Sequence, residues 1–227
     1  MLQAVAFDLD HTLYDRAATF AALSPAFADS FRACLDEKLS LDDLTLALQE
    51  TDSATCNRTN WPGVYELLIS RGVFTRAPGL DFFTDYILKV FPASVVPYPD
   101  TYDVIESCRA RGLKTAIITN GLLDIQSRKI DSLNLREYMD LCVISAEVGK
   151  HKPAPEPFWY AAEKLGLSPE SIMFVGDNPQ NDVWGSRNAG MLPVWFDVLH
   201  DWDDTIAPAP TIHSLSELLP MLDDILS

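Results

Sequence analysis

The stretch AVAFDLDHTLY, residues 4–14, decides the fold of this 227-residue chain. Its first four residues are apolar and include β-branched Val5 and aromatic Phe7, a pattern that indicates a short buried strand. Asp8 and Asp10 follow where this apolar run ends. Because an open α/β sheet binds ligands at the carboxyl ends of its strands, we expect both carboxylates in a crevice, close enough to share a cation. A strand that merely ends in a turn is the competing interpretation, since Asp and Thr are ordinary turn residues.

The charge balance limits the partners of this chain. Asp and Glu number 33 against 17 Lys and Arg, which gives a formal net charge of −16. No basic excess exists to neutralise phosphates, so we expect no nucleic-acid partner. A small phosphorylated substrate remains compatible with this charge, because a bound divalent cation inverts the local field.

The sequence indicates neither a membrane protein nor an oxidising compartment. No segment approaches the roughly 20 apolar residues of a membrane span, and Met1 leads into the first strand without a basic or apolar leader. The four cysteines lie far apart and form no Cys-x-x-Cys pair, so neither a zinc site nor a disulfide framework is indicated. We expect a cytoplasmic protein with reduced thiols and no membrane partner. Its oligomeric state stays open between a monomer and a homodimer.

Helical spacing replaces the strand pattern after Tyr14. Apolar side chains recur three or four residues apart between Phe20 and Leu35, as on one face of an amphipathic helix. Pro25 is expected to kink or restart this helix. Only helices are expected between residues 15 and 94, and they cover about 20–35, 41–48, 62–70 and 79–91.

Strands alternate with helices in the rest of the chain. Such alternation predicts a parallel, doubly wound sheet of the Rossmann-like kind, with helices on both faces. The predicted fold is therefore an α/β core domain, residues 1–14 and 95–227, with an inserted all-helical domain, residues 15–94. A capping box at Ser214–Glu217 is expected to open the last helix. The predicted strands after the first are 113–119, 141–145, 171–176 and 192–196, and the helices between them include 101–111, 156–165 and 181–189.

Polar residues suited to a phosphate follow three of these later strands. The tripeptide TNG, residues 119–121, offers a hydroxyl donor and free backbone N–H groups before a helix. Lys152, which precedes a proline, supplies a cation that balances charge on a transferring phosphoryl group. Asp177 and Asp182 supply the oxygen ligands that suit magnesium. Each group is common by itself, but all of them fall at the carboxyl ends of consecutive predicted strands.

This ordered set resembles the four motifs of the haloacid dehalogenase-like hydrolase superfamily. The resemblance covers residues 1–14 and about 97–195, and the helical insertion resembles the cap domain of that family in position and size only. Residues 8–12 resemble the first motif, Thr119 the second, Lys152 the third, and Gly176-Asp177 with Asp182 the fourth.

The resemblance implies a phosphatase mechanism in which Asp8 is the nucleophile and forms an aspartyl-phosphate. Asp10 would then protonate the leaving alcohol and later deprotonate the attacking water. A magnesium ion would be held by Asp8, the backbone carbonyl of Asp10 and Asp177, with Asp182 acting through water. The phosphoryl group would be held by the substrate-binding residues Thr119, Asn120, Gly121 and Lys152, of which Thr119 and Lys152 also count as catalytic.

Two other sequence features resemble parts of these motifs, and one residue inside the first motif has no assigned role. The stretch DWDDT, residues 201–205, also fits Asp-x-Asp-x-Thr, but it follows no buried strand and runs into Pro208, so we expect a solvated loop. Lys150 is an alternative phosphate ligand, and Lys152 is preferred because it precedes proline, as in the family pattern. His11 stands where the family often has a small residue, and it is assigned no role.

The leading hypothesis is a magnesium-dependent phosphatase that acts on a small phosphorylated metabolite, such as a nucleoside monophosphate or a sugar phosphate. A phosphomutase or a phosphonatase would use the same core. The resemblance argues against a 2-haloacid dehalogenase, because such members lack the carboxylate of Asp10, and retention of all four motifs argues against an inactive binding domain. Substrate contacts are expected from the insertion, although helix packing is the favoured interpretation for each candidate: Tyr14, Arg16, Phe20, Arg58, Asn60, Trp61 and Arg76.

Overall fold

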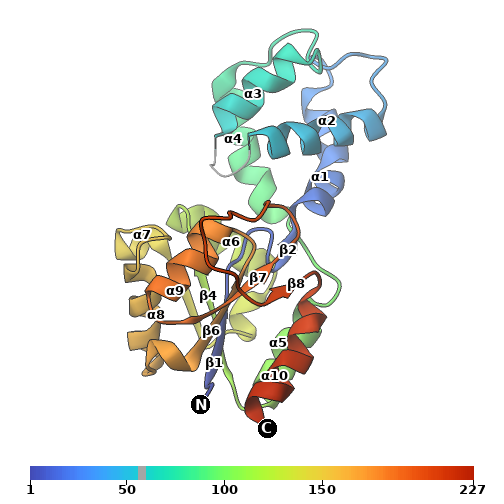
Figure 1. The fold of residues 1–227 in the computed structure, drawn as a ribbon. Helices are drawn as coiled ribbons and strands as arrows, with labels where there is room; N and C mark the ends of the chain where they lie inside the picture. Colours follow the sequence, from blue (N-terminus) through green and yellow to red (C-terminus); the bar gives the residue numbers. More distant parts are fainter. Residues whose placement is uncertain (56–59) are drawn as a thin grey trace. The chain divides into compact units, whose positions relative to one another are not determined.

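The structure is a computed structural model that describes residues 1–55 and 60–227 (Figure 1). Arg58, one of the candidate substrate contacts, lies outside these residues. The described chain divides into two compact units, of which the first is Met1–Asp15 with Pro97–Ser227 and the second is Arg16–Val96. These boundaries fall one and two residues beyond the predicted ones, after residues 14 and 94.

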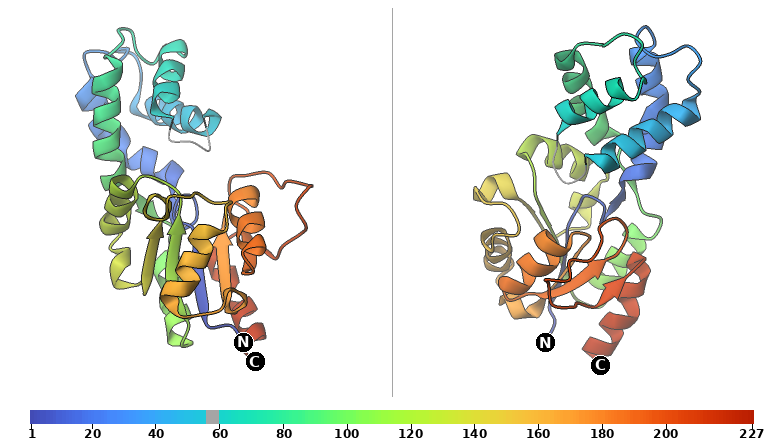
Figure 2. Two further views of the ribbon diagram at one scale, coloured as in Figure 1. Left: turned by 90° about the vertical axis from the view of Figure 1, so that its left-hand side faces the viewer. Right: turned by 45° about the horizontal axis from the view of Figure 1, so that its top comes forward.

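A six-stranded sheet forms the centre of the first unit (Figures 1 and 2). Its strand order is β5-β4-β1-β6-β7-β8, and every neighbouring pair is parallel, as the alternating sequence pattern predicted. The final strand was not predicted, because its two residues are too few to produce a periodic pattern. The strands are β1 (Ala4–Phe7), β4 (Lys114–Thr119), β5 (Leu141–Ile144), β6 (Ile172–Gly176), β7 (Leu192–Phe196) and β8 (Thr211–Ile212).

The register of β1 brings the predicted site residues to one edge of the sheet. Phe7 pairs with Ile117 of β4 on one side and with Val175 of β6 on the other. Asp8 lies one residue beyond this paired level, and Thr119 and Asp177 lie two residues beyond it. All three therefore lie at the carboxyl end of the sheet. All four residues of β1 are fully buried, because a central parallel strand is covered on both faces.

Helices cover both faces of this sheet, which confirms the predicted α/β class (Figures 1 and 2). On one face α8 packs its apolar side against Ala116, Val143 and Phe174, and the rings of Phe158 and Phe174 meet edge to face. α5 and α10 lie on the other face (Figure 1). The helices of this unit are α5 (Thr101–Ala110), α6 (Leu123–Ser132), α7 (Ser145–Val148), α8 (Glu156–Leu165), α9 (Gly185–Asn188) and α10 (Leu218–Leu226).

The structure differs from two local predictions in this unit. The expected helix over 181–189 starts two residues earlier, as a π-helical turn over Pro179–Trp184 that continues into α9. The expected capping box does not form, because Ser214 Oγ donates to the Glu217 carboxylate at 3.4 Å instead of accepting from a backbone amide. The other carboxylate oxygen of Glu217 accepts from the backbone of His213 at 3.0 Å, and α10 begins only at Leu218.

The second unit contains four helices among its described residues. The chain enters it through β2 (Tyr14–Asp15) and leaves it through β3 (Val96–Pro97). The first helix runs through Pro25 without interruption and ends at Phe31, so the prediction that it reaches Leu35 was wrong. The helices are α1 (Arg16–Phe31), α2 (Leu41–Ala54), α3 (Trp61–Ser70) and α4 (Leu80–Val90), followed by a 3₁₀ turn over Phe91–Ala93.

Most of the candidate substrate contacts of this unit have structural partners within it. Arg16 makes a two-point ion pair with Asp52, at 2.6 and 2.8 Å, and its guanidinium lies 4.5 Å from the ring centroid of Phe91. Asn60 caps α3 by accepting a hydrogen bond from the backbone of residue 63 at 3.1 Å. Phe20 and Trp61 are buried, which leaves Arg76 as an exposed candidate. The other four side chains, Arg16, Phe20, Asn60 and Trp61, therefore have packing or capping roles within this unit.

No helix in the described part of the chain is both long and apolar enough to cross a membrane.

The second unit holds its helices together through aromatic packing. The ring of Phe83 is fully buried and lies 6.3 Å from Phe27, 6.0 Å from Phe31 and 6.4 Å from Phe74, measured between ring centroids. Neighbouring Phe82 is 55% exposed, and its ring centroid lies 5.2 Å from that of Phe31.

We expect Phe83→Ala to lower the free energy of unfolding by about 3–5 kcal/mol, because it removes a fully buried ring and leaves a cavity. Phe82→Ala, the same substitution on the adjacent residue, should cost about 1 kcal/mol, since one partly exposed aromatic contact is lost. Urea denaturation followed by circular dichroism measures both values. Equal losses for the two variants would show that Phe83 does not anchor the aromatic cluster.

Candidate active site

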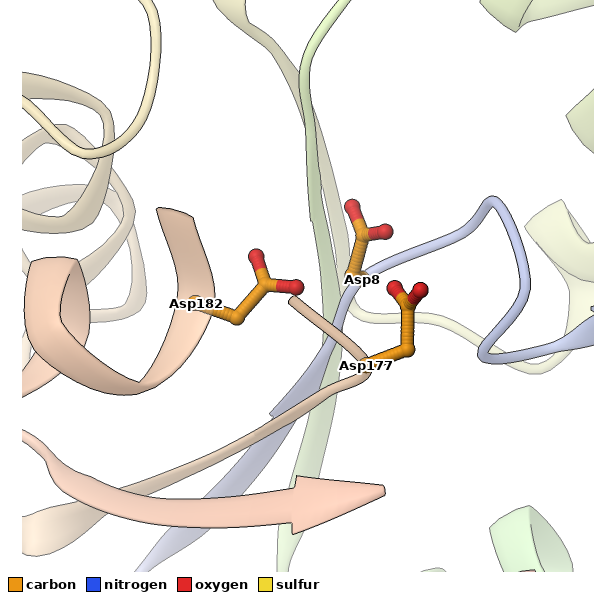
Figure 3. Close-up of side chains that lie close together, drawn as sticks. All are labelled: Asp8, Asp177 and Asp182. Atoms are coloured by element: carbon orange, nitrogen blue, oxygen red, sulfur yellow. The ribbon is translucent and has the colours of Figure 1, made fainter. Parts of the chain in front are cut away.

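Three carboxylates from separate segments meet at the carboxyl end of the sheet (Figure 3). Asp8 follows β1, Asp177 follows β6, and Asp182 lies in the π-helical turn before α9. One oxygen of each lies within 4.8 Å of the others, and all three residues are buried. The structure thus brings together three of the four residues predicted to bind metal.

Local hydrogen bonds fix the two later carboxylates of this cluster. The Asn178 side chain begins the π-helical turn by accepting from the backbone of Asn181 at 2.8 Å, and Asp182 Oδ2 accepts from the backbone N–H of Asn178 at 3.0 Å. The indole N–H of Trp195 donates to the Asp177 carbonyl at 2.9 Å. Residue 176 must be glycine, because a Cβ there would lie 2.5 Å from the Asp182 carboxyl carbon.

Lys152 supplies a buried cation to the cluster. Its Nζ donates to Asp8 Oδ1 at 2.6 Å and to Asp182 Oδ1 at 2.7 Å, whereas Lys150 is exposed. The Asn120 side chain holds the backbone of Lys152 at both polar atoms, by accepting from its N–H at 2.8 Å and donating to its carbonyl at 2.9 Å. Asn120, predicted as a substrate ligand, therefore positions the lysine through its side chain.

The electrostatics of the cluster favour a divalent cation. Burial raises the pKa of Asp8 to about 7, Lys152 opposes this shift, and Asp182 and Asp10 add to it. Burial, followed by the charges of Asp182 and Asp8, raises the pKa of Asp177 well above its usual range. Burial lowers the pKa of Lys152, but Asp182 and Asp8 outweigh it, so that pKa is raised overall. Both carboxyl shifts have the direction that a bound cation reverses.

The donor set itself fits magnesium. The cluster offers only carboxylate oxygens, the hard ligands that this ion prefers. Asp177 Oδ2 is buried and accepts no hydrogen bond from the residues that the structure describes. His200 Nε2 lies 3.3 Å from this oxygen, and burial lowers the pKa of His200 while Asp182 and Asp201 oppose the shift. A buried carboxylate oxygen that accepts no hydrogen bond, beside two further carboxylates, is suited to bind a cation.

Asp10 faces a different environment from Asp8. Its carboxylate accepts from Tyr14 Oη, from Gln126 Nε2 at 2.7 Å and from Lys129 Nζ at 2.6 Å. The side chain of Asp10 therefore lies outside the three-carboxylate cluster, and only its backbone carbonyl remains a predicted metal ligand. Neither Gln126 nor Lys129 was predicted from the sequence, although their spacing on the helix after TNG places them on one face.

The TNG tripeptide differs from its prediction at one position. Thr119 Oγ1 accepts a hydrogen bond from Gln126 Nε2 at 2.7 Å. The backbone N–H of Gly121 donates to Ser145 Oγ at 3.0 Å, so it is not the free phosphate donor that was expected. The prediction was wrong because the first residue of α7 reaches this amide from a segment far away in sequence.

The second Asp-x-Asp-x-Thr stretch lies in a loop, as predicted. Asp203 accepts from the backbone and hydroxyl of Thr205, at 2.9 and 2.6 Å, which is a local turn. Trp202 packs its ring 4.9 Å from that of Trp195. Among the described residues, none of the carboxylates of this loop belongs to the three-carboxylate cluster of Asp8, Asp177 and Asp182.

A sequence model of the haloacid dehalogenase-like hydrolase family matches residues 2–190. The chain belongs to this family, which confirms the resemblance found in its four motifs. It is 32% identical over 206 residues to the glyceraldehyde 3-phosphate phosphatase of Methanopyrus kandleri, an alignment that covers 86% of this chain and 83% of the relative. It is 27% identical to the phosphoglycolate phosphatase of Salmonella typhimurium over 97% of this chain and 92% of the relative.

Solved structures share the whole fold. A haloacid dehalogenase-like phosphatase from Thermococcus onnurineus superposes with a TM-score of 0.65 and 25% identity, over 97% of this chain and 98% of the other. A hydrolase of the same family from Bacillus subtilis gives a TM-score of 0.74 at 20% identity, over 98% and 99% of the two chains. These matches confirm the α/β fold class.

We expect Mg²⁺ to raise the melting temperature of the protein relative to the same protein in EDTA, because the cation relieves repulsion among the three buried carboxylates. At a free concentration 100 times the Kd, binding adds about 2.7 kcal/mol of stability. Differential scanning calorimetry measures the shift. Asp177→Asn should abolish it, whereas Asp81→Asn, at an exposed carboxylate of α4, should retain it. An equal response of both variants would place the cation elsewhere.

Proposed function

We propose that this protein is a magnesium-dependent phosphatase that hydrolyses a small phosphorylated metabolite through an aspartyl-phosphate on Asp8. One observation carries the proposal: the buried Asp8 carboxylate lies between Lys152 and two further carboxylates that fit a cation. Membership of a hydrolase family and similarity to named phosphatases support it. The proposal places the enzyme in the cytoplasm as a monomer or a homodimer, with no nucleic-acid or membrane partner.

The geometry suits phosphoryl transfer to a carboxylate. Bound Mg²⁺, held by Asp8, Asp177 and Asp182 with the Asp10 carbonyl, would neutralise charge on the phosphoryl oxygens. Lys152 lowers the repulsion that a dianionic phosphate otherwise meets at Asp8, and positioning with charge neutralisation does most of the catalysis. Thr119, the last residue of β4, would donate its hydroxyl proton to a phosphoryl oxygen.

Two transfers complete the proposed reaction. In the first, a carboxylate oxygen of Asp8 bonds to phosphorus, the ester P–O bond breaks, and Asp10 donates a proton to the leaving alkoxide. In the second, Asp10 takes a proton from water, the water oxygen bonds to phosphorus, and the bond between Asp8 and phosphorus breaks. Orthophosphate leaves and both carboxyl groups return to their starting states, so the same acid serves as base.

The helical unit is proposed to act as the cap that supplies substrate contacts. Its expected role is to exclude water and to hold the part of the substrate beyond the phosphate. The named relatives act on glyceraldehyde 3-phosphate and phosphoglycolate, and a pyrimidine 5'-nucleotidase of Escherichia coli is 38% identical over 128 residues, 56% of each chain. These names support sugar phosphates and nucleoside monophosphates as the substrate classes to assay first.

A panel of phosphorylated metabolites, assayed for released orthophosphate with Mg²⁺ and with EDTA, tests the function. We expect metal-dependent release from at least one phosphate monoester, and none of the corresponding product from a phosphonate or a 2-haloacid. Asp8→Asn should lower kcat by at least about a thousandfold, because the nucleophile is removed. Asp201→Asn, at the first aspartate of the lookalike stretch, should leave kcat unchanged. Turnover that survives in Asp8→Asn, or that ignores EDTA, would exclude the mechanism.

Asp10→Asn tests the acid–base role separately. The variant cannot donate a proton to the alkoxide or accept one from water, so the phosphorylated enzyme should either accumulate or form slowly. Intact-protein mass spectrometry after rapid quenching detects the covalent phosphate, and steady-state assays give kcat. We expect kcat to fall by about a hundredfold or more. Normal turnover would assign the proton transfers to another group.

A further inference from the structure

Two buried polar side chains of α6 have no part in the mechanism described so far. Gln126 and Lys129 lie three residues apart on one helical face, and they are only 2% and 5% exposed. Burial of an amide or an ammonium is unfavourable unless the group is hydrogen-bonded or paired with a charge. The partners of these two side chains therefore explain why they are buried.

Gln126 connects two residues of the proposed mechanism. Its Nε2 donates to Asp10 Oδ2 at 2.7 Å and to Thr119 Oγ1 at 2.7 Å, which uses both amide protons. Because the Thr119 oxygen accepts from Gln126, its own proton is directed elsewhere, and its further contact, to the Asn120 carbonyl, is long at 3.5 Å. This arrangement leaves the hydroxyl proton of Thr119 available to donate to a phosphoryl oxygen.

Lys129 fixes the other oxygen of the same carboxylate. Its Nζ donates to Asp10 Oδ1 at 2.6 Å, and Tyr14 Oη donates to the same oxygen. The ammonium also lies 5.6 Å from the centroid of the Tyr14 ring. With Gln126 on Oδ2 and Lys129 on Oδ1, rotation of the Asp10 carboxylate would break at least two hydrogen bonds.

The glycine of TNG makes room for this arrangement. Gly121 has a φ of +148°, and a Cβ at this position would lie 2.8 Å from Gln126 Cγ. Any larger residue would push Gln126 away from Asp10 and Thr119. Position 121 therefore requires glycine because of the space that Gln126 fills. This requirement does not depend on the backbone N–H of Gly121, which donates to Ser145 Oγ.

We propose that Gln126 and Lys129 are positioning residues that hold Asp10 and Thr119 in register for phosphoryl transfer. Gln126 ties the acid–base group to the phosphate-binding hydroxyl, and Lys129 fixes the orientation of the Asp10 carboxylate. The inference rests on the proposed function, because positioning has meaning only where Asp10 donates a proton and Thr119 holds phosphate.

Dependence on the leaving group distinguishes positioning from a merely structural role. A misplaced Asp10 fails to protonate an alkoxide, which cannot leave without a proton. The p-nitrophenolate ion leaves without one, so the transfer of phosphate from p-nitrophenyl phosphate to Asp8 depends little on Asp10. Hydrolysis of the aspartyl-phosphate uses Asp10 as a base with either substrate, and kcat/KM, which reports the first transfer, excludes this shared step. Loss of positioning therefore lowers the ratio of kcat/KM for an alkyl phosphate to kcat/KM for p-nitrophenyl phosphate, whereas general destabilisation lowers both values together.

The test compares these two substrates in Lys129→Met, Gln126→Leu and Gln126→Asn. We expect the ratio to fall about 10- to 100-fold in each, which is part of the factor of 10² to 10⁴ that acid–base catalysis supplies. Lys129→Arg, which keeps a donor cation, should recover part of the ratio. Lys164→Met removes an exposed lysine of α8 and should leave the ratio unchanged. Mn²⁺ binding, measured by electron paramagnetic resonance, should stay within about threefold of wild type in all variants, since the three-carboxylate cluster is intact.

The outcomes separate this inference from the proposed function. An unchanged ratio in any of the Met, Leu or Asn variants that folds, with wild-type activity that requires Asp8, overturns the positioning role and leaves the phosphatase in place. Gln126→Asn keeps the amide and shortens the side chain by one methylene, so it supplies a folded variant if the apolar substitutions fail to fold. A wild-type protein that releases no phosphate from any ester refutes the proposed function, and the inference fails with it.

Discussion

The structure depends on a charge balance at the carboxyl end of its sheet. Three buried carboxylates, Asp8, Asp177 and Asp182, each place one oxygen within 4.8 Å of the others. The ammonium group of Lys152 contacts two of them. With all four groups ionised the set carries a net charge of −2, which burial makes costly. The raised pKa values of Asp8 and Asp177 express that cost as a tendency to bind protons. A divalent cation would remove the same charge without protonating Asp8, so this charge balance favours a bound metal.

Strand topology brings Asp8 and Asp177, two of the three carboxylates, together. β1 lies between β4 and β6, so Asp8, the proposed nucleophile, emerges at the centre of the sheet, with Thr119 on one side and Asp177 on the other. Lys152 comes from the segment after β5, yet Asn120 holds its backbone at both polar atoms. Each charged group is thus fixed by an element that the hydrophobic core already orders. Such rigidity is what catalysis by preorganised charge requires.

The sequence was enough to predict the fold class and the carboxylate cluster, because both follow from local patterns combined with one topological rule. Apolar runs that end in Asp8, Thr119 or Asp177 need only a parallel sheet to meet at one edge. Features set by distant segments were not predictable in this way. Ser145 reaches the amide of Gly121 across 24 residues, and Lys129 reaches Asp10 across 119. A lysine and a glutamine on a helix usually indicate a solvated face, and only the three-dimensional structure shows that this face is buried.

The difference between Asp8 and Asp10 follows from a single turn in the backbone. His11 has a φ of +59°, a left-handed conformation that costs a non-glycine residue on the order of 1 kcal/mol. The turn that begins there brings Tyr14 back beside Asp10, where the two residues form an isolated bridge and a side-chain hydrogen bond. The carboxylate of Asp10 is thereby directed to the donors of α6, while that of Asp8 stays with Lys152. Two identical side chains two residues apart acquire unlike surroundings, which is the condition for one to attack while the other carries protons. His11 therefore contributes to this difference through its backbone conformation.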